Sequence, residues 1–196
     1  MPSEGAAGET PVKAPRADAQ RNAGLVLAGA RRAVAVHGLG VSYHEIARLA
    51  GVGVGTVYRR FPQRDQLMAA VLLDILDELI DEAERALECP DPWEGFTGVF
   101  TSLALRAREN AGLSGSLDEQ GGPRVAAQRR RLLDLLHRVT ERAHRARVLR
   151  DDVSWEDIPF LAQAATPTGC VLDVPAGPQQ AQRAITVILD GLHTPS

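Results

Sequence analysis

Residues 42–61 predict two short helices joined by a tight turn, and this stretch constrains the fold more than any other part of the chain. Ser42 can cap the first helix, because Glu45 follows three residues later and completes a capping box. Gly51 tolerates a left-handed backbone, so the first helix is expected to end there. The second helix starts two or three residues later and ends at Phe61, before a proline that cannot continue it. This arrangement is typical of a helix-turn-helix, whose second helix can enter the DNA major groove.

The second helix carries the side chains that DNA binding requires. Val57 and Phe61 lie four residues apart and can anchor this helix to a core. Hydroxyl and guanidinium groups, which hydrogen-bond phosphates or base edges, project from its other faces at Thr56, Tyr58, Arg59 and Arg60. Gly55 would let DNA approach the backbone closely. From this pattern alone, the alternative is a small helical hairpin with two solvated arginines.

Over roughly its first third, the chain resembles the TetR/AcrR family of transcriptional regulators. The motif residues occur in a fixed order: Ile46, Ala47, Ala50, Gly51 and Val52, then Gly55, Thr56, Tyr58 and Phe61, then Arg64, Asp65 and Leu67. The chain departs from the usual family pattern at Ala23, Gly24, Ala33 and Val34. We expect phosphate contacts from Ser42, Tyr43, Thr56, Tyr58 and Arg64, and base-edge contacts from Gly55, Thr56 and Arg59.

The resemblance also implies partners. Such proteins are homodimers that bind a palindromic operator in double-stranded DNA, and the expected role is a repressor released by a small-molecule effector. The last two long helices would pack against the partner's copies as a four-helix bundle, with contacts from Leu161, Ala165, Ala181, Ala184, Ile185, Ile188 and Leu192. A pocket in the C-terminal domain would be lined by Phe96, Phe100, Leu103, Leu136, Thr140, Phe160 and Gln163. Each pocket residue also fits an ordinary apolar core.

Charge is distributed unevenly along the chain, whose formal net charge is −3. Residues 11–70 contain nine basic and three acidic side chains, whereas residues from 71 onward contain 13 arginines and 20 acidic side chains. A basic head on an acidic body suits a protein that presents one end to a polyanion. The excess is modest and does not by itself establish DNA binding.

The 196 residues are enough for a real core in one or two domains. We expect a disordered arm over residues 1–15, a helix-turn-helix domain over 16–63 and a helical ligand-binding and dimerisation domain over 64–196. Cys89 and Cys170 are expected to be reduced thiols. Without a signal peptide or an apolar run of membrane-spanning length, the sequence predicts a soluble, cytoplasmic protein with no membrane association.

The body reads as a series of helices, and persistent strand-like alternation is absent, so the expected fold class is all-α. Helices are expected at about residues 18–37, 64–87, 93–110, 125–148, 154–168 and 179–192, and one short helix could lie within 111–123. Pro159 implies a late or distorted start to its helix. The helix that begins near Arg64 is the one element placed to touch both halves.

Several clusters of polar side chains can be explained without a catalytic or metal-binding role. The acidic side chains of the 64–87 helix are expected to form a solvated face: Asp74, Asp77, Glu78, Asp81, Glu82 and Glu84. Arginines 129–131 suit a solvated face or a partner for that acidic helix. His137 and His144 could share a helix face, but ligands at metal-binding spacing are missing, so neither metal nor cofactor is expected.

Two other classes of function compete with DNA binding. An enzyme is disfavoured, because the sequence contains no G-x-S-x-G, P-loop or dinucleotide fingerprint, and no catalytic residues are assigned. A helical adaptor that binds protein through its hairpin is the second alternative. Retardation of the DNA upstream of the protein's own gene would separate these possibilities.

Overall fold

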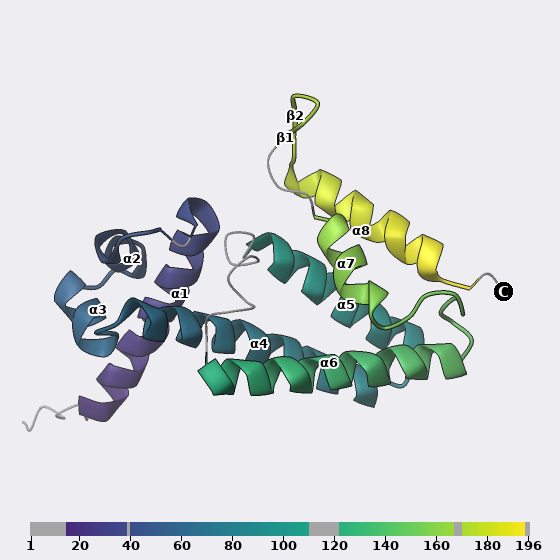
Figure 1. Cartoon of the computed structure of the whole chain (residues 1–196), viewed down its shortest axis with the longest axis horizontal. Coiled ribbons are helices and arrows are strands. Elements are labelled where there is room, and N and C mark those ends of the chain that lie inside the picture. Colours follow the sequence, from purple (N-terminus) through teal and green to yellow (C-terminus); the bar gives the residue numbers. More distant parts are fainter. Residues whose placement is uncertain (1–14, 39, 110–121, 167–169, 195–196) are drawn as a thin grey trace, which may run out of the picture.

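The computed structural model describes residues 15–38, 40–109, 122–166 and 170–194. Over these ranges the chain forms helices α1 to α8 and one short hairpin, which confirms the all-α class (Figure 1). The expected arm over residues 1–15 lies outside the described residues except for its last residue. The expected short helix within 111–123 also lies almost entirely outside them.

The N-terminal head consists of α1 (Pro15–His37), α2 (Tyr43–Ala50) and α3 (Val54–Arg60). Figure 1 shows α1 as the long purple helix, against which the two short helices pack. Their apolar faces meet in a small core that excludes solvent completely at Val26, Ala30, Ala33, Val34, Ile46 and Val57. The buried residues of α1 and α2 recur at helical spacing, so each of these helices has one apolar face. Burial of these faces holds the head together.

The ends of α2 follow the expected local signals. The Ser42 hydroxyl accepts a hydrogen bond of 3.2 Å from the backbone N–H of Glu45. Gly51 adopts a left-handed conformation with φ of 66°, and its N–H reaches carbonyls of the last turn. Only half of the expected capping box forms, because the Glu45 carboxylate is taken up by Arg48, which lies 2.6 Å away.

Helix α4 (Arg64–Glu88) joins the head to the body. It contacts α1 in the head and both α5 and α6 in the body, so it touches both halves as expected. Its buried stripe includes Leu67, Val71 and Ile80, which are at most 1% exposed. The single continuous helix α4 therefore joins the two units, which also meet where α1 contacts α5.

The body is built from α4, α5 (Pro92–Glu109), α6 (Gly122–Arg145), α7 (Asp157–Ala164) and α8 (Pro178–Leu192). Helices α5 and α6 pack against α4, and α7 packs against α5. Figure 1 shows α8, in yellow, along the outside of the body. The loop after α6 ties down the end of α8, since the N–H of Arg150 donates to the carbonyl of Leu192 over 3.1 Å.

Three acidic residues of α4 form ion pairs with arginines of other helices while staying partly exposed, so this face is not only solvated as expected. Glu78 and Asp74 bind Arg31 of α1. Glu84 lies 2.5 Å from Arg131 of α6, so at least one residue of the arginine run is a partner for α4. These partners are 43 to 47 residues away in sequence, and helix periodicity gives no information about such pairs.

The segment after α6 departs most from expectation. Helix α7 covers only Asp157–Ala164, because Pro159 lies in its first turn and the helix ends before the predicted residue 168. Two short antiparallel strands follow, β1 (Cys170–Val171) and β2 (Val174–Pro175), where no strand was predicted. Leu172 and Asp173 both have positive φ, at 51° and 64°, which is the geometry of a tight two-residue hairpin turn.

Candidate nucleic-acid interface

Helix α3 is anchored on one side and open on the other. Val57 is 0% exposed, and Phe61, which follows the helix, is buried. Gly55, Tyr58, Arg59 and Arg60 are exposed, and Tyr58 leaves 52% of its surface in solvent. The exposed side therefore combines a phenol, two guanidinium groups and a glycine on a short rigid helix.

Thr56 and Arg59 lie next to each other on α3. A guanidinium N–H of Arg59 donates to the Thr56 hydroxyl over 3.3 Å in an exposed hydrogen bond, and Thr56 as a residue is half-buried. A Cβ atom added to Gly55 would meet only Arg59, at 4.0 Å, so the fold does not require a glycine there. The space beside Gly55 is open to a ligand that approaches the backbone, and a hydroxyl and a guanidinium lie at its border.

Tyr43 has a structural role besides the expected phosphate contact. Its hydroxyl donates a hydrogen bond of 2.9 Å to the backbone carbonyl of Phe61, and only 7% of the residue is exposed. Burial raises the pKa of this phenol. Its ring contacts that of Tyr58, with 4.7 Å between centroids. Tyr43 therefore packs against the exposed Tyr58, and its contact with a phosphate stays a prediction.

Arg64 anchors the head to the start of α4. Its guanidinium donates to the backbone carbonyl of Val41 over 2.7 Å, just before the Ser42 cap. Arg32 of α1 donates in the same way to the carbonyl of Leu49, near the end of α2. Sequence reasoning assigned Arg64 only to a phosphate and gave Arg32 no role. Both residues hold α2 in position relative to its neighbours.

Arg60 is a cation that sequence reasoning placed on the helix but left out of the expected contacts. Its guanidinium carbon lies 5.5 Å from the centroid of the Phe61 ring, and the residue is exposed. A cation held over an aromatic ring keeps its charge at the surface. Together with Arg59 it makes the C-terminal end of α3 positive.

The seven residues expected to line an effector pocket differ in their burial. Phe96, Phe100 and Leu136 are core residues, each at most 3% exposed, and Leu103 is half-buried. Thr140 is also buried, and it borders a small hollow of about 220 Å³ near Trp155. Phe160 and Gln163 are instead exposed on α7, and Phe160 leaves 74% of its surface in solvent.

A larger cleft lies between the head and the body. It has a volume of about 600 Å³ and is bordered by α1, α4 and α5. Polar side chains contribute Arg31, Arg32, Asp74, Glu78, Arg106 and Glu109. Among the described residues, no group of three or more His, Cys, Asp or Glu is arranged to hold a metal ion.

The residues expected at a dimer interface divide into two sets. Ala165, Ala181, Ile185 and Leu192 are at most 5% exposed within the single chain, so they attach α7 and α8 to the body. Leu161, Ala184 and Ile188 are half-buried. The most exposed apolar side chains on these two helices are Phe160 and Val187, and Val187 is 68% exposed.

A basic three-helix head whose third helix, α3, presents an exposed face, joined to a helical body, defines the class of helix-turn-helix DNA-binding regulators. Residues 26–71 match the model of bacterial regulatory proteins of the tetR family, and residues 91–194 match that of the C-terminal domain of SbtR-like transcriptional regulators. The chain therefore belongs to the TetR family, and it is a DNA-binding transcriptional regulator.

Solved structures support the same assignment. A TetR transcription regulatory protein from Mycobacterium vanbaalenii is 32% identical, with a TM-score of 0.66 over 91% of this chain and 99% of that one. A TetR transcriptional regulator from Streptomyces coelicolor is 25% identical, with a TM-score of 0.63 over 89% and 99%. AibR, in complex with isovaleryl coenzyme A and operator DNA, shares the fold at 16% identity, with a TM-score of 0.65 over 89% of this chain and 100% of that one. A search of curated proteins gave no match. None of the described helices is long and apolar enough to cross a membrane.

Proposed function

We propose that the protein is a homodimeric repressor that binds a palindromic operator and is released from it by a small-molecule effector. The observation that carries this proposal is the exposed face of α3, where Gly55, Thr56, Tyr58 and Arg59 surround an open approach to the helix backbone. Arg59, Thr56 and Gly55 are the proposed base-edge contacts. Tyr58, Ser42 and Arg64 are the proposed phosphate contacts.

Ser42 and Arg64 stabilise the head through hydrogen bonds and are also proposed to contact a phosphate. The Ser42 hydroxyl accepts a hydrogen bond from the Glu45 N–H, and its own proton can still be donated to a phosphate. Arg64 begins α4 and holds the backbone in front of Ser42. A phosphate bound by these two residues would fix the head on the DNA backbone at the junction of α2 and α4.

The proposed dimer uses the outer faces of α7 and α8. Phe160 and Val187 are large apolar side chains that the single chain leaves in solvent, and Leu161, Ala184 and Ile188 are half-covered. An apolar face of this kind is stabilised when a second copy covers it. TetR family membership supports a dimer, and a two-fold dimer presents two α3 helices to half-sites about one DNA turn apart, or a multiple of it.

The position of α4 supports the proposal that an effector controls DNA binding. The helix touches α1 on one side and α5 and α6 on the other, so a ligand in the body that displaces α4 would change the separation of the two heads. The ligand can shift the equilibrium at most by its differential affinity for the two states. AibR, which has the same fold, was solved with both a ligand and operator DNA.

Retardation of the DNA upstream of the protein's own gene tests the proposal. We expect a saturable complex and a footprint with two symmetry-related halves. Binding without sequence preference, or a single asymmetric half-site at saturation, would contradict it. Binding to a protein target with no DNA retardation would instead support the helical adaptor.

The effector is tested by reciprocity. A ligand found by thermal-shift screening is titrated with and without operator DNA. A coupling of about 1–3 kcal/mol would weaken both binding reactions by the same factor, roughly 5- to 150-fold. Equal ligand affinity in the two titrations would rule out release by this ligand while leaving DNA binding intact.

A further inference from the structure

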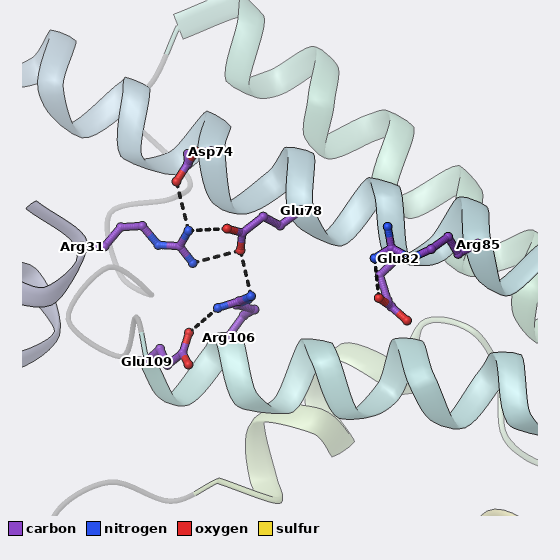
Figure 2. Close-up of polar contacts among 7 residues, drawn as sticks. All are labelled: Arg31, Asp74, Glu78, Glu82, Arg85, Arg106 and Glu109. Atoms are coloured by element: carbon purple, nitrogen blue, oxygen red, sulfur yellow. Dashed lines mark hydrogen bonds and ion pairs between the residues drawn. The ribbon is translucent and has the colours of Figure 1, made fainter. Parts of the chain in front are cut away.

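Glu78 is held by two arginines from two different helices (Figure 2). Arg31 of α1 donates two hydrogen bonds to its carboxylate, over 2.7 and 3.0 Å. Arg106 of α5 lies 2.9 Å from Glu78 Oε2. Because Glu78 is part of α4, one carboxylate connects a helix of the head, the connecting helix and a helix of the body.

Two further acids complete this arrangement, which we call the Glu78 cluster: Arg31, Asp74, Glu78, Arg106 and Glu109. Arg31 also reaches Asp74 over 2.9 Å, and Arg106 also reaches Glu109 over 2.6 Å. The Arg31 side chain is 16% exposed, so it is held more firmly than a surface arginine. A fork-shaped guanidinium with two bonds to one carboxylate restrains direction as well as distance.

The cluster lies at the cleft of about 600 Å³ between α1, α4 and α5. Gly24, Ala28 and Ala35 form part of the α1 wall, and such short side chains reach only a little way towards α5. The two arginines therefore make a polar connection across a place where apolar packing is sparse. The orientation of α1 relative to α5 depends on this connection more than it would in a closely packed interface.

Glu82 offers an internal comparison on the same helix. It lies one turn beyond Glu78, and its ion pair with Arg85, at 2.6 Å, stays within α4 (Figure 2). Glu82→Gln and Glu78→Gln each remove one negative charge from α4. Of the two, only Glu78→Gln breaks ion pairs with arginines of α1 and α5.

We propose that Glu78 is a positioning residue for DNA binding, which sets the orientation of the reading head by holding Arg31 and Arg106 at the same time. This inference rests on the proposed function as a dimeric operator-binding protein. Both heads of a dimer must meet their half-sites together, so a loosely oriented head loses contacts without any change in α3 itself. The residue acts through Arg31 and does not touch DNA.

The first test measures the orientation of the head without DNA. Spin labels are attached at His44→Cys on α2 and Arg138→Cys on α6, both exposed positions, in a chain with Cys89→Ser and Cys170→Ser. An excess of unlabelled chain ensures that each dimer carries one labelled pair. We expect Glu78→Gln to broaden the distance distribution and Glu82→Gln to leave it unchanged. Equal distributions in the two variants would overturn the proposal.

The second test measures affinity for the upstream DNA by fluorescence anisotropy at fixed salt. Glu78→Gln is expected to weaken binding about fivefold or more, the lower end of usual coupling effects, while Glu82→Gln changes it less than about twofold. A broadened distance distribution with unchanged affinity would overturn the positioning role. If the unmodified protein does not bind this DNA, the proposed function fails, and the distance measurement alone decides whether Glu78 orients the head.

Arg106→Gln provides an independent variant in case Glu78→Gln fails to fold. It removes the link to α5 and leaves both bonds between Arg31 and Glu78. The same broadening is expected, with the thermal unfolding midpoint close to that of the unmodified chain. An unchanged distribution in a folded Arg106→Gln protein would also contradict the proposal.

Discussion

Gly29 of α1 lies directly against Ala50 at the end of α2: a Cβ atom added to Gly29 would lie 2.6 Å from the Ala50 Cβ and 2.8 Å from its backbone nitrogen. Real Cβ atoms do not approach other atoms so closely, and backbone cannot move aside as a flexible side chain can. The two helices therefore cross at the smallest separation that a glycine allows. This contact sets the position of α2, and through α2 that of α3.

Gly29→Ala is expected to destabilise the head by about 1–3 kcal/mol, because the added methyl group forces α1 and α2 apart. Gly24→Ala on the same helix is the matched control, since a Cβ there meets no atom within 4 Å. A helical alanine should leave stability unchanged or raise it by up to about 1 kcal/mol. Urea unfolding of both variants measures the difference. Equal stability in the two variants would show that α1 and α2 can separate freely.

Gly55→Ala separates folding from binding. The added Cβ has no neighbour closer than 4.0 Å, so the free energy of unfolding should stay the same or increase slightly. If DNA approaches α3 at this point, the methyl group should weaken operator binding by about 1–3 kcal/mol. Retardation and thermal unfolding of the same preparation measure both effects. Unchanged operator affinity would place the DNA on another part of α3.

Arg59→Ala should weaken operator binding by about 1–3 kcal/mol and relax the preference at one base position. Tyr58→Phe removes one hydrogen bond to a phosphate, so it should weaken binding to all sequences alike by roughly 1 kcal/mol. Arg85→Ala is the charge-matched control, because Arg85 pairs with Glu82 within α4. Affinities for a set of single-base operator variants distinguish the two effects. Loss of affinity in Arg85→Ala equal to that in Arg59→Ala would indicate a general charge effect.

Val187→Asp is expected to dissociate the dimer, because it places a charge in the apolar interface that the partner would cover. Burying this charge would cost several kcal/mol. Val36→Asp is the control, since Val36 is 74% exposed on α1 in the head and lies away from α8. Light scattering at equal protein concentration measures the mass. A stable dimer in both variants would mean that the outer face of α8 is not the dimer interface.

Acid should reduce the contribution of the Glu78 cluster to stability. Hydrogen bonds from Arg31 are the main cause that lowers the pKa of Glu78 in the folded chain. A lowered pKa gives stability that is complete above the unfolded pKa, near 4.3 for a glutamate, and that is lost as the pH falls through the folded value. The difference in unfolding free energy between the unmodified chain and Glu78→Gln should therefore narrow below about pH 4. A difference that stays constant down to pH 3 would contradict the cause assigned to this shift.

Local signals in the sequence were sufficient for the head. The cap at Ser42, the left-handed glycine at position 51 and the proline after Phe61 each act within a few residues, so the limits of α2 and α3 could be predicted. The motif residues also gave the family, which both family models confirm. The same signals could not show that Tyr43 turns inward, because its hydrogen-bond partner lies 18 residues away.

The sequence showed that α8 has an apolar face, but it did not show what that face packs against. A spacing of three or four residues shows that one face is apolar, whereas the element that covers this face is decided by packing. The structure turns Ile185 into the body and Val187 outward, so the proposed dimer contacts moved by part of a turn. The late start of α7 follows the local signal of Pro159, whereas its early end and the hairpin at Leu172 were not predicted from the sequence.

The composition and order of residues determined an all-α regulator with a basic helix-turn-helix head. Only the tertiary structure decided which charges on α4 have partners. Glu78 and Glu82 lie one turn apart and are chemically identical, yet Glu78 binds arginines of two other helices while Glu82 binds within its own helix. Sequence patterns encode which residues can form a helix and which face is apolar. The pairing of distant side chains depends on how those helices cross, and close contacts such as that of Gly29 with Ala50 set the crossing.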